Sequence, residues 1–329
     1  MGASGGLRGR RVGRDRTVGV VVAVALVFAG LVASARPVAA AETDPPLPAP
    51  AVAWHAVPRA GPNGWVQLLG MVAGPGEGTT ALYTYAEYLV LEPGGPALPA
   101  KGPTMLVVHR DATGRVVWLH RVFGSSYDQH LAVGPDGDVV VVANFTTSAT
   151  LDDDTTPVLS IPPGFTALLA FTASGARAWQ RGLTGVAYEF GLDVGPGGHV
   201  LLSGIVLQGS ELGVATGLAP PSGAAPNQQM VARIDRGGVL RWAVGVDGTS
   251  GLKPVWANGG DVAVSATNTT YFVRGPVVVH AADGPWTVAE PVPDEGTVSA
   301  VFFLGGDGAR VPRAAASGSR AWNPTPVGG

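Results

Sequence analysis

The stretch "WLHRVFGSSYDQHLAVGPDGDVVVVANF", residues 118–145, decides the fold, because the chain repeats its outline in "WQRGLTGVAYEFGLDVGPGGHVLLSGIV", residues 179–206. Few residues are identical. The Trp, the Gly-Pro turn, the second Gly and the apolar run nevertheless keep their places, 61 residues further along. A fixed period of this length is the signature of an architecture built from stacked, similar units, so the repeat is interpreted before any single residue.

Two markers recur with this period. In the first, a turn Gly precedes a Trp by four residues, in the pairs Gly114 and Trp118, Gly175 and Trp179, and Gly238 and Trp242. In the second, a turn Gly precedes an apolar run, at Gly137, Gly198 and Gly260. An earlier, degenerate copy starts at Trp54, and a last fragment, "AVFFLGGDGARVP", carries Pro312 in the place of the Trp. These Trp and Gly residues are predicted to be the structural positions of the repeat.

Each unit is predicted to consist of four strands. Runs such as "MLVVHR", "ALLAF" and "MVARI" end in a turn whose Gly supplies the positive φ of a hairpin, and the Trp-bearing run is the return strand. A third run ends at the Gly-Pro turn. The fourth, as in "DVVVVANF", is apolar almost continuously, which is typical of a strand covered on both faces. No part of the chain after the N-terminal segment shows a convincing helical period.

These units predict an all-β fold, a β-propeller of four four-stranded blades. Five blades are the alternative, because residues 268–299 are poorly patterned, and a solenoid of stacked strands is the main rival fold. Each Trp is expected to fill the space between adjacent blades, where burial of the indole contributes about 2–3 kcal/mol. The first copy lacks the strand before its Trp, and we expect the C-terminal strand "AVFFL" to complete it and close the ring.

The ends of the chain predict four regions. Residues 1–41 have five Arg in "LRGRRVGRDR", an apolar run and small residues before Ala41, which is typical of an export signal peptide cleaved near Ala41. The alternative is a retained membrane anchor over the 19 residues 17–35. A Pro-rich spacer is expected at 42–51, the repeat domain at 52–311 and a disordered tail at 312–329.

The amino-acid composition excludes some classes of site and binding partner. The chain has no Cys, which excludes disulfides and Cys-based metal sites. Without residues 1–41 it keeps 15 basic and 23 acidic residues, and this net charge argues against nucleic acid and anionic membrane surfaces as partners. Only two Lys occur, Lys101 and Lys253, which we attribute to genome composition. We expect a protein secreted, periplasmic or at the cell surface, with a protein or glycan of the cell envelope as partner.

The outline "MLVVHRDATGRVVW…HLAVGPDGDVVVVANF" resembles the bacterial SBBP-type β-propeller repeat family, over residues 52–311. The resemblance implies a propeller in an exported protein, and it implies no catalytic residues, because that family shares none. The segment "DATGRVVW" is also similar to the turn and Trp of quinoprotein propellers, which ranks second. Their units are shorter, and no cofactor-binding residue can be matched, so no cofactor is expected.

Candidate ligand-binding residues lie at matching places in two copies. Tyr127, Tyr188 and Glu189 fall between the Trp strand and the third strand, where we expect an exposed loop face, although packing of the two Tyr is the competing interpretation. Asp152, Asp153 and Asp154 form the only dense acidic cluster and are the candidate metal ligands. Adjacent Asp residues in an extended chain point apart, so a solvated loop is the alternative.

Other titratable residues give no coherent pattern. The six His recur at no common place in the repeat, although His109, His120 and His130 are near enough in sequence to meet. A carboxylate pair for glycoside hydrolysis would have to be chosen from Asp128, Asp136, Glu189 and Asp193. The repeat explains Asp111, Asp235 and Asp136 as turn residues. The sequence therefore predicts a non-catalytic binding or scaffolding module, with a secreted hydrolase or a quinoprotein relative as the alternative.

Overall fold

The computed structural model describes residues 58–151, 157–159, 165–183, 186–206, 228–247, 249, 251–257, 260–269, 277–281, 283–289, 296–311 and 317–321. All of them belong to one unit, residues 51–329. The described residues form antiparallel strands in five sheets, with short 3-10 segments such as η1 (Pro75–Glu77) and η2 (Pro196–Gly198) between them. The prediction of an all-β fold is confirmed.

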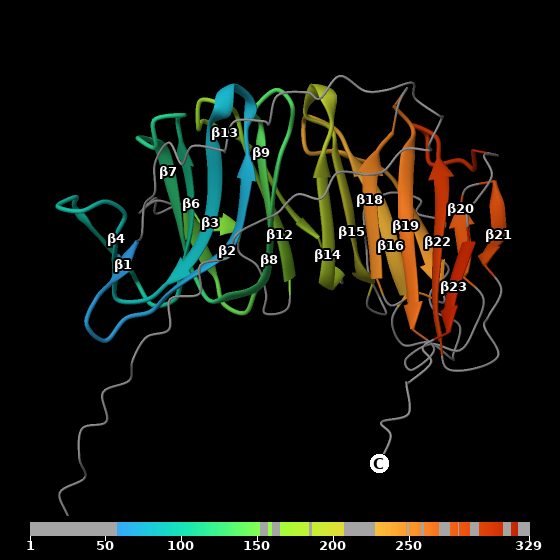
Figure 1. Ribbon diagram of the computed structural model, residues 1–329, viewed down its shortest axis with the longest axis horizontal. Helices are drawn as coiled ribbons and strands as arrows, with labels where there is room; N and C mark the ends of the chain where they lie inside the picture. The colour runs from blue at the N-terminus through green and yellow to red at the C-terminus, as the bar shows by residue number, and fades with distance from the viewer. Residues whose placement is uncertain are drawn as a thin grey trace, which may run out of the picture. The chain divides into compact units, whose positions relative to one another are not determined.

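Four of the sheets are copies of one another (Figure 1). The first contains β2 (Val66–Ala73), β3 (Thr79–Tyr85), β6 (Thr104–Arg110) and β7 (Val116–Phe123). The second contains β8 (Ser126–Val133), β9 (Val139–Phe145), β12 (Phe165–Phe171) and β13 (Arg177–Leu183). The third contains β14 (Val186–Val194), β15 (Val200–Val206), β16 (Gln228–Ile234) and β17 (Leu240–Asp247). The fourth contains β18 (Gly251–Trp256), β19 (Val262–Thr269), β22 (Gly296–Leu304) and β23 (Ser317–Ala321).

The sheets begin at a different point of the repeat from the one used to define it in sequence. The first three start with the strand before a Gly-Pro turn and end with the Trp strand, and the fourth starts before the corresponding turn "ANGG", so that "MLVVHR"-type runs are third strands. The proposed closing strand "AVFFL" lies in β22, which pairs with β19 and β23 of the fourth sheet. The prediction that it completes the first copy is therefore wrong, because its own sheet uses both of its edges.

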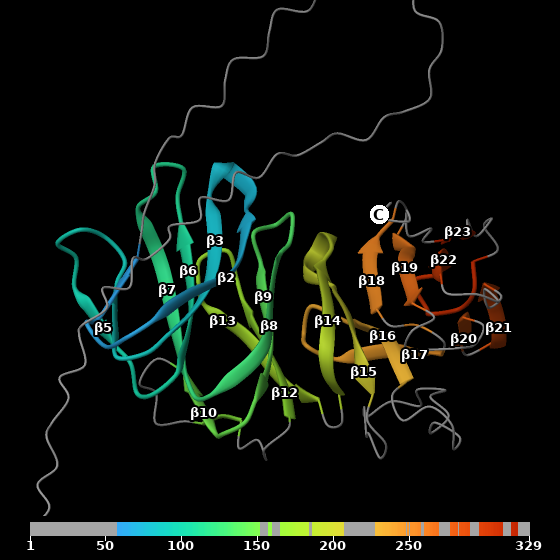
Figure 2. The same cartoon turned by 60° about the horizontal axis from the view of Figure 1, so that its bottom comes forward.

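Neighbouring sheets pack face to face in chain order (Figures 1 and 2). The first strands make contact in series, β2 with β8, β8 with β14 and β14 with β18. All seven residues of β9 are buried, because one face of the strand packs against the first sheet and the other against the third. The continuous apolar runs of the sequence follow from this burial on both faces.

Each repeat Trp lies over a turn of the next sheet. A Cβ at Gly175 would lie 2.5 Å from Cγ of Trp118, and one at Gly238 would lie 2.8 Å from Cδ2 of Trp179. Gly308 relates to Trp242 in the same way, at 2.9 Å. The three glycines also have φ of 85°, 79° and 83°, the left-handed region that favours glycine. The repeat therefore needs Gly at this place for its backbone conformation and for the room that the indole occupies.

Three hairpins extend sheets sideways. β10 (Ala149–Leu151) and β11 (Pro157–Leu159) continue the first sheet beyond β7, and β20 (Val277–Ala281) and β21 (Gly284–Ala289) continue the third beyond β17. In each case the hairpin comes from the following repeat, so it ties two neighbouring sheets together. The fifth sheet pairs β4 (Tyr88–Val90) and β5 (Ala97–Pro99) with β1 (Arg59–Ala60).

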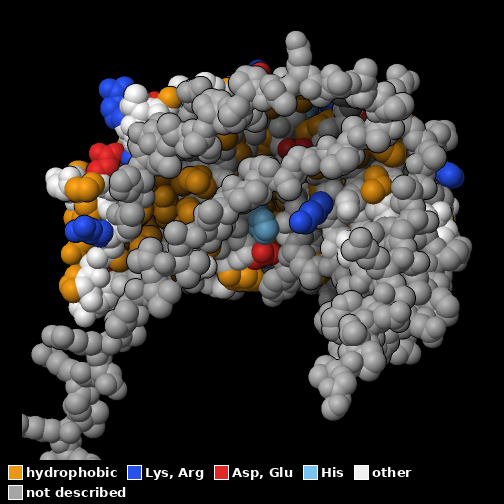
Figure 3. Space-filling view, viewed as in Figure 1, with side chains coloured by type: hydrophobic (Ala, Val, Ile, Leu, Met, Phe, Trp, Pro, Cys, Tyr) orange, Lys and Arg blue, Asp and Glu red, His pale blue; other side chains and the backbone are white. Residues whose placement is uncertain are grey.

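This fifth sheet is the edge of an incomplete preceding copy. Arg59 pairs with Val90 five residues after Trp54, as Phe123 pairs with Thr150 five residues after Trp118. No described strand supplies the three inner positions of that copy. Leu68 and Met71 are accordingly 51% and 54% exposed, and Figure 3 shows hydrophobic side chains gathered on the side where Figure 1 draws the first sheet.

The prediction of a disordered tail over 312–329 is wrong for residues 317–321. These small and polar residues form β23, which pairs with Gly296–Ala300 of β22 through backbone hydrogen bonds. Backbone pairing makes no demand on side-chain type, so composition alone did not reveal the strand. Among the described residues no helix is long and apolar enough to cross a membrane, and the predicted signal peptide at 1–41 lies outside them.

Candidate functional site

A groove runs along the first strands of the second, third and fourth sheets. It has a volume of 690 Å³. Its lining residues come from β8, β14, β18 and β19: His130, Leu131, Phe190, Gly191, Leu192, Asp193, Gly251, Leu252, Lys253, Pro254, Val255, Ser265 and Thr267. Apolar walls with a few polar and charged groups are typical of a binding groove rather than of a buried core.

Bulges in the first strands shape this groove. The register shifts between Leu68 and Gly70 in β2, between Tyr127 and His130 in β8, and between Ala187 and Gly191 in β14. A bulge bends its strand and re-aims side chains, and here it recurs at the same place in three sheets. Glycine at two of the positions after the bulge leaves room for the next sheet, since a Cβ at Gly191 would lie 3.0 Å from Cδ of Pro254.

His130 and Asp128 form the polar centre of the bulge in β8. Nε2 of His130 lies 3.1 Å from Oδ1 of Asp128, and the ring of Phe190 meets the imidazole edge-on, with 6.1 Å between ring centroids. Asp128 has φ of 50°, an unusual conformation for a residue other than glycine. Its Oδ2 is buried and has no hydrogen-bond partner among the described residues. Local strain of this kind is found preferentially at binding and catalytic sites.

The other polar groups near the groove hold sheets together. Oδ2 of Asp193 accepts a hydrogen bond from the backbone N–H of Trp256 at 3.0 Å. The hydroxyl of Ser203 donates to the carbonyl of Leu252 at 2.8 Å and accepts from the N–H of Gly191. These contacts fix β18 against β14 and β15, so the groove has a rigid floor.

The predicted ligand-binding residues lie in strands, not in an exposed loop. Tyr127 is in β8 and is half-buried, and Tyr188 and Glu189 are in β14, with side chains outside the described part of the structure. The connection between Trp strand and first strand is too short for a loop face, because β7 ends at Phe123 and β8 begins at Ser126. Asp152, Asp153 and Asp154 lie outside the described residues.

The histidines that the structure describes do not come together as a metal site. The ring of His109 stacks on that of Trp118 with centroids 5.3 Å apart, whereas His120 contacts the carbonyl of Gly175 at 2.6 Å and stacks on Phe171. In the part of the chain that the structure describes, no three His, Asp or Glu side chains group as metal ligands. Burial lowers the pKa of His109 despite the opposing effect of Asp111.

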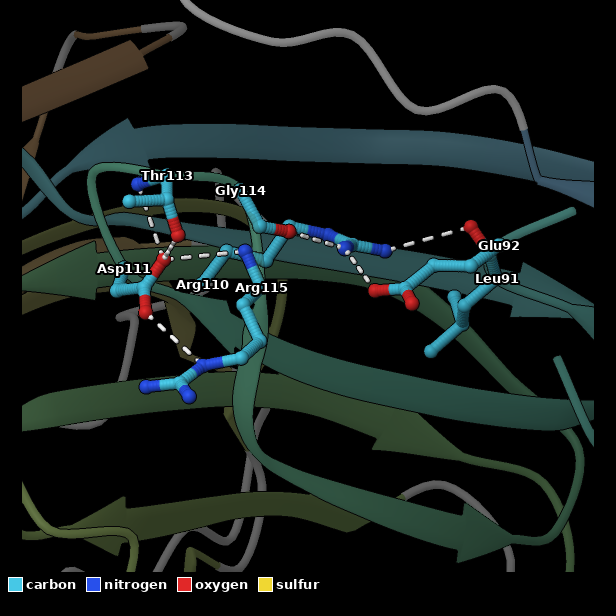
Figure 4. Close-up of polar contacts among 7 residues, drawn as sticks. All are labelled: Leu91, Glu92, Arg110, Asp111, Thr113, Gly114 and Arg115. Carbon is cyan, nitrogen blue, oxygen red and sulfur yellow. Dashed lines mark hydrogen bonds and ion pairs between the residues drawn. The ribbon is translucent and has the colours of Figure 1, made fainter.

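The turn carboxylates have the structural role that the sequence predicts. Oδ1 of Asp111 accepts hydrogen bonds from the N–H groups of Thr113 and Arg115, both at 3.0 Å, and from the hydroxyl of Thr113 at 2.6 Å (Figure 4). The hydroxyl contact is the largest cause that lowers the pKa of Asp111. Asp235 closes the corresponding turn of the third sheet with the N–H groups of Gly237 and Val239.

Asp136 links two turns. Its Oδ2 accepts from the N–H of Gly197, the equivalent turn in the next sheet, at 2.9 Å. Beside the first hairpin, the buried guanidinium of Arg110 donates to Oε1 of Glu92 at 2.8 Å and to the carbonyl of Gly114 at 2.6 Å (Figure 4). These polar contacts join turns to neighbouring segments, so they stabilise the fold and leave the groove as the candidate site.

Comparisons with known proteins add little. No family model matches the chain, and no curated protein matches it. Nine chains of solved structures match. One of them, described as "Crystal structure of an ACO/RPE65 chimera", is 10% identical with a TM-score of 0.30, over 74% of this chain and 59% of that chain. The chain thus spans less than two thirds of that structure, and a likeness this distant carries no argument about function.

Sequence reasoning missed the groove residues. The sequence grouped His130 only with His109 and His120, and Lys253 was attributed to genome composition. The available signal was the repeat itself: His130, Gly191 and Lys253 stand opposite Val142, Ser203 and Ser265 on three successive sheets, so they are equivalent positions with different residues. A position that the fold leaves free to vary between copies is a candidate for function.

Proposed function

We propose that the chain is a non-catalytic β-propeller repeat protein of the SBBP type, with four blades, exported by its N-terminal segment and acting as a binding or scaffolding module at the cell envelope. The observation that carries the proposal is the groove along the first strands, with apolar walls and the polar groups of Lys253 and of His130, which Asp128 holds by a hydrogen bond. The four equivalent sheets and the Trp-on-Gly contacts between them support the propeller part.

The groove suits a partner with mixed character. Leu131, Leu192 and Pro254 offer apolar contact, whereas Lys253 and His130 offer hydrogen-bond donors. A protein segment or a glycan chain laid along the strands satisfies both demands. The export signal is expected to bring the domain to that partner.

The alternative, a hydrolase with a carboxylate pair, is less well supported. Of its four candidate residues, Asp136 and Asp193 accept backbone hydrogen bonds that join neighbouring sheets. A general acid or base must be available to exchange a proton with substrate, and these two carboxylates are held by structural contacts. Asp128 shares its described hydrogen bond with His130 rather than with a second carboxylate.

The experiment is capture of envelope and culture fractions on the immobilised protein, with Lys253→Glu and His130→Ala as groove variants and Val117→Ala as a control outside the groove. A captured species that is lost with either groove variant and kept with the control supports the proposal. Protease treatment of the fraction then separates a protein from a glycan partner. No captured species, or capture that ignores the groove variants, contradicts the proposal; release of soluble product from the fraction favours the hydrolase.

A further inference from the structure

Three arginines of the third sheet depart from the pattern of the repeat. Arg233, Arg236 and Arg241 lie on the hairpin that joins β16 to β17, and we call them the arginine hairpin. The second sheet aligns with the third from the start of its third strand to its Trp, residues 165–179 on 228–242. In that alignment the residues opposite the three arginines are Ala170, Ala173 and Ala178.

The other two sheets also lack these arginines. The three positions lie five and two residues before the turn Gly and three residues after it. Counted from Gly114, the first sheet has His109, Ala112 and Val117 there, and counted from Gly308, the fourth has Phe303, Gly306 and Val311. Four copies of one hairpin fold with four different sets of residues there, so the backbone does not require the arginines. Three of the 15 basic residues that follow residue 41 converge on one hairpin of an acidic chain, which calls for another explanation.

The three arginines open onto one pocket. It has a volume of 530 Å³ and lies between the hairpin of the third sheet and the turn of the fourth. It is lined by His199, Arg233, Asp235, Arg236, Gly237, Arg241, Trp242, Gly306 and Asp307. The site is separate from the groove, because the two share no lining residue.

The pocket is lined by three Arg and by the carboxylates of Asp235 and Asp307, so its lining has one positive charge in excess. Asp235 accepts from two backbone N–H groups and pairs with both Nε and Nη2 of Arg241, and Asp307 accepts from the N–H of Ala309. Arg236 forms a long ion pair with Asp138, at 3.8 Å, and its side chain is 69% exposed. The described hydrogen bond of Arg233 goes to the neutral carbonyl of Gly306, and its guanidinium lies 5.3 Å from the ring centroid of Trp256.

Buried polar atoms around the pocket are also without partners among the described residues. Nε of Arg233, Nδ1 of His199 and Nε1 of Trp256 are buried and make no hydrogen bond with any described residue. A buried polar atom without a partner costs about 1–3 kcal/mol, so three close together favour a site where water or a bound ligand supplies the missing partners. Burial and the charges of Arg233 and Arg241 lower the pKa of His199, although Asp235 opposes them.

We propose that the arginine hairpin and His199 form a binding site for an oxyanion of the phosphate or sulfate type. Guanidinium groups match the paired oxygens of such anions with two parallel N–H donors, which Lys would not do. The pocket is open to solvent, so the anion can be a free ion or a group on a larger molecule. The site does not depend on the proposed partner of the groove.

The test is calorimetric titration of the full-length chain, expressed so that any N-terminal processing has taken place, with inorganic phosphate, inorganic sulfate, glycerol 1-phosphate and acetate at low ionic strength. Saturable binding of phosphate or sulfate, with acetate at least tenfold weaker, is expected. Binding of glycerol 1-phosphate as tight as that of phosphate identifies an ester-borne group as a possible source, and much weaker binding identifies the free ion. No saturable binding of phosphate or sulfate overturns the proposal.

Variants taken from the repeat itself give the controls. R233A/R236A/R241A installs the residues of the second sheet and is expected to lower phosphate affinity at least tenfold, and R236A alone to lower it several-fold. R115A is the matched control, because Arg115 pairs with Asp111 in the first hairpin as Arg241 pairs with Asp235. Equal weakening by R115A and R236A overturns the proposal.

A second readout does not depend on the stability of the triple variant. In the unchanged protein, NMR titration of the imidazole of His199 with phosphate is expected to raise its pKa, because the anion stabilises the charged ring. The resonances of His109, on the first sheet, serve as the internal control. An unchanged His199 in the presence of saturating phosphate contradicts a role for His199 in the site.

Discussion

The indole of Trp118 in the first sheet covers Gly175 in the hairpin of the second sheet, and its Nε1 donates to the carbonyl of Ala173 at 3.1 Å. The same relation joins Trp242 to Gly308, with a hydrogen bond of 2.9 Å to Gly306. Each of the first three sheets therefore places its Trp ring over a turn of the next sheet that has no room for a Cβ. This contact explains why the Trp and the Gly recur together in the sequence.

A Cβ at Gly175 is expected to destabilise the protein in two ways. Alanine at φ of 85° is strained by about 1 kcal/mol or more, and its methyl group would also overlap the ring of Trp118, which adds about 1–3 kcal/mol. Gly260 has the same φ and no atom within 4 Å of the added Cβ, so Gly260→Ala measures the strain alone. Urea unfolding should show a larger loss for Gly175→Ala. Equal losses would refute the contact.

Removal of a carboxylate that bridges two sheets is expected to lower stability more where the carboxylate is partly buried than where it is exposed. Asp193 accepts from the N–H of Trp256 in a partly buried position, whereas Asp136 accepts from the N–H of Gly197 at the surface. Asp193→Ala leaves a partly buried donor unpaired and should lower the free energy of unfolding by about 1–3 kcal/mol. Asp136→Ala should cost less, because water replaces the lost acceptor. Chemical denaturation of both variants checks the order, and a reversal contradicts it.

Stability is expected to fall as pH drops below neutrality. Burial lowers the pKa of both His109 and His199 from the ordinary value of 6.5, so the unfolded chain binds protons more readily than the folded chain does. The stabilising contribution is therefore present above pH 6.5 and is lost as pH falls below it. In His109→Gln the free energy of unfolding should vary less between pH 7.5 and 5.5 than in the unchanged protein, as urea unfolding at a series of pH values measures. An identical slope contradicts the assignment.

Asp128 is expected to contribute to partner binding at the groove and to contribute little to the stability of the fold. Asn tolerates the left-handed conformation and removes a carboxylate whose Oδ2 has no described partner, so Asp128→Asn should change the free energy of unfolding by less than about 1 kcal/mol. Capture of the envelope partner should nevertheless be reduced. Thermal unfolding and the capture assay together check this. A large loss of stability with capture unchanged would mean that Asp128 is structural.

The sequence predicted the sheets better than it predicted the site. The spacing of Trp118, Trp179 and Trp242 gave the period of the repeat. The continuous apolar runs, such as β9, indicated strands that are buried on both faces. A repeat has no marked starting point, however, so the sheet boundaries were misplaced and "AVFFL" was assigned to the wrong sheet. Tyr127 looked like a loop residue because a bulge interrupts the alternation of β8.

The arginine hairpin was visible in the sequence only as an exception. The residues that the copies share indicate the fold. Arg233, Arg236 and Arg241 are not shared, because another copy has alanine at their positions, so a search for shared residues misses them. That these residues face one pocket with His199 depends on the stacking of the third and fourth sheets, which places Gly306 and Asp307 beside them. Apart from the recurring Trp and Gly, no local pattern of the sequence shows which residues meet across neighbouring sheets.

The stacking of successive sheets is the central claim, and a disulfide between β2 and β8 tests it most directly. A Cβ at Gly70 would lie 3.9 Å from Cβ of Leu131, within the range of about 3.5–4.5 Å that a disulfide requires, and the chain has no other Cys. Under mild oxidation Gly70→Cys/Leu131→Cys should form an intramolecular disulfide, seen by mass spectrometry of the intact chain, and each single variant should keep a free thiol. Two thiols that stay free in the folded double variant would contradict the stacking of the first sheet on the second.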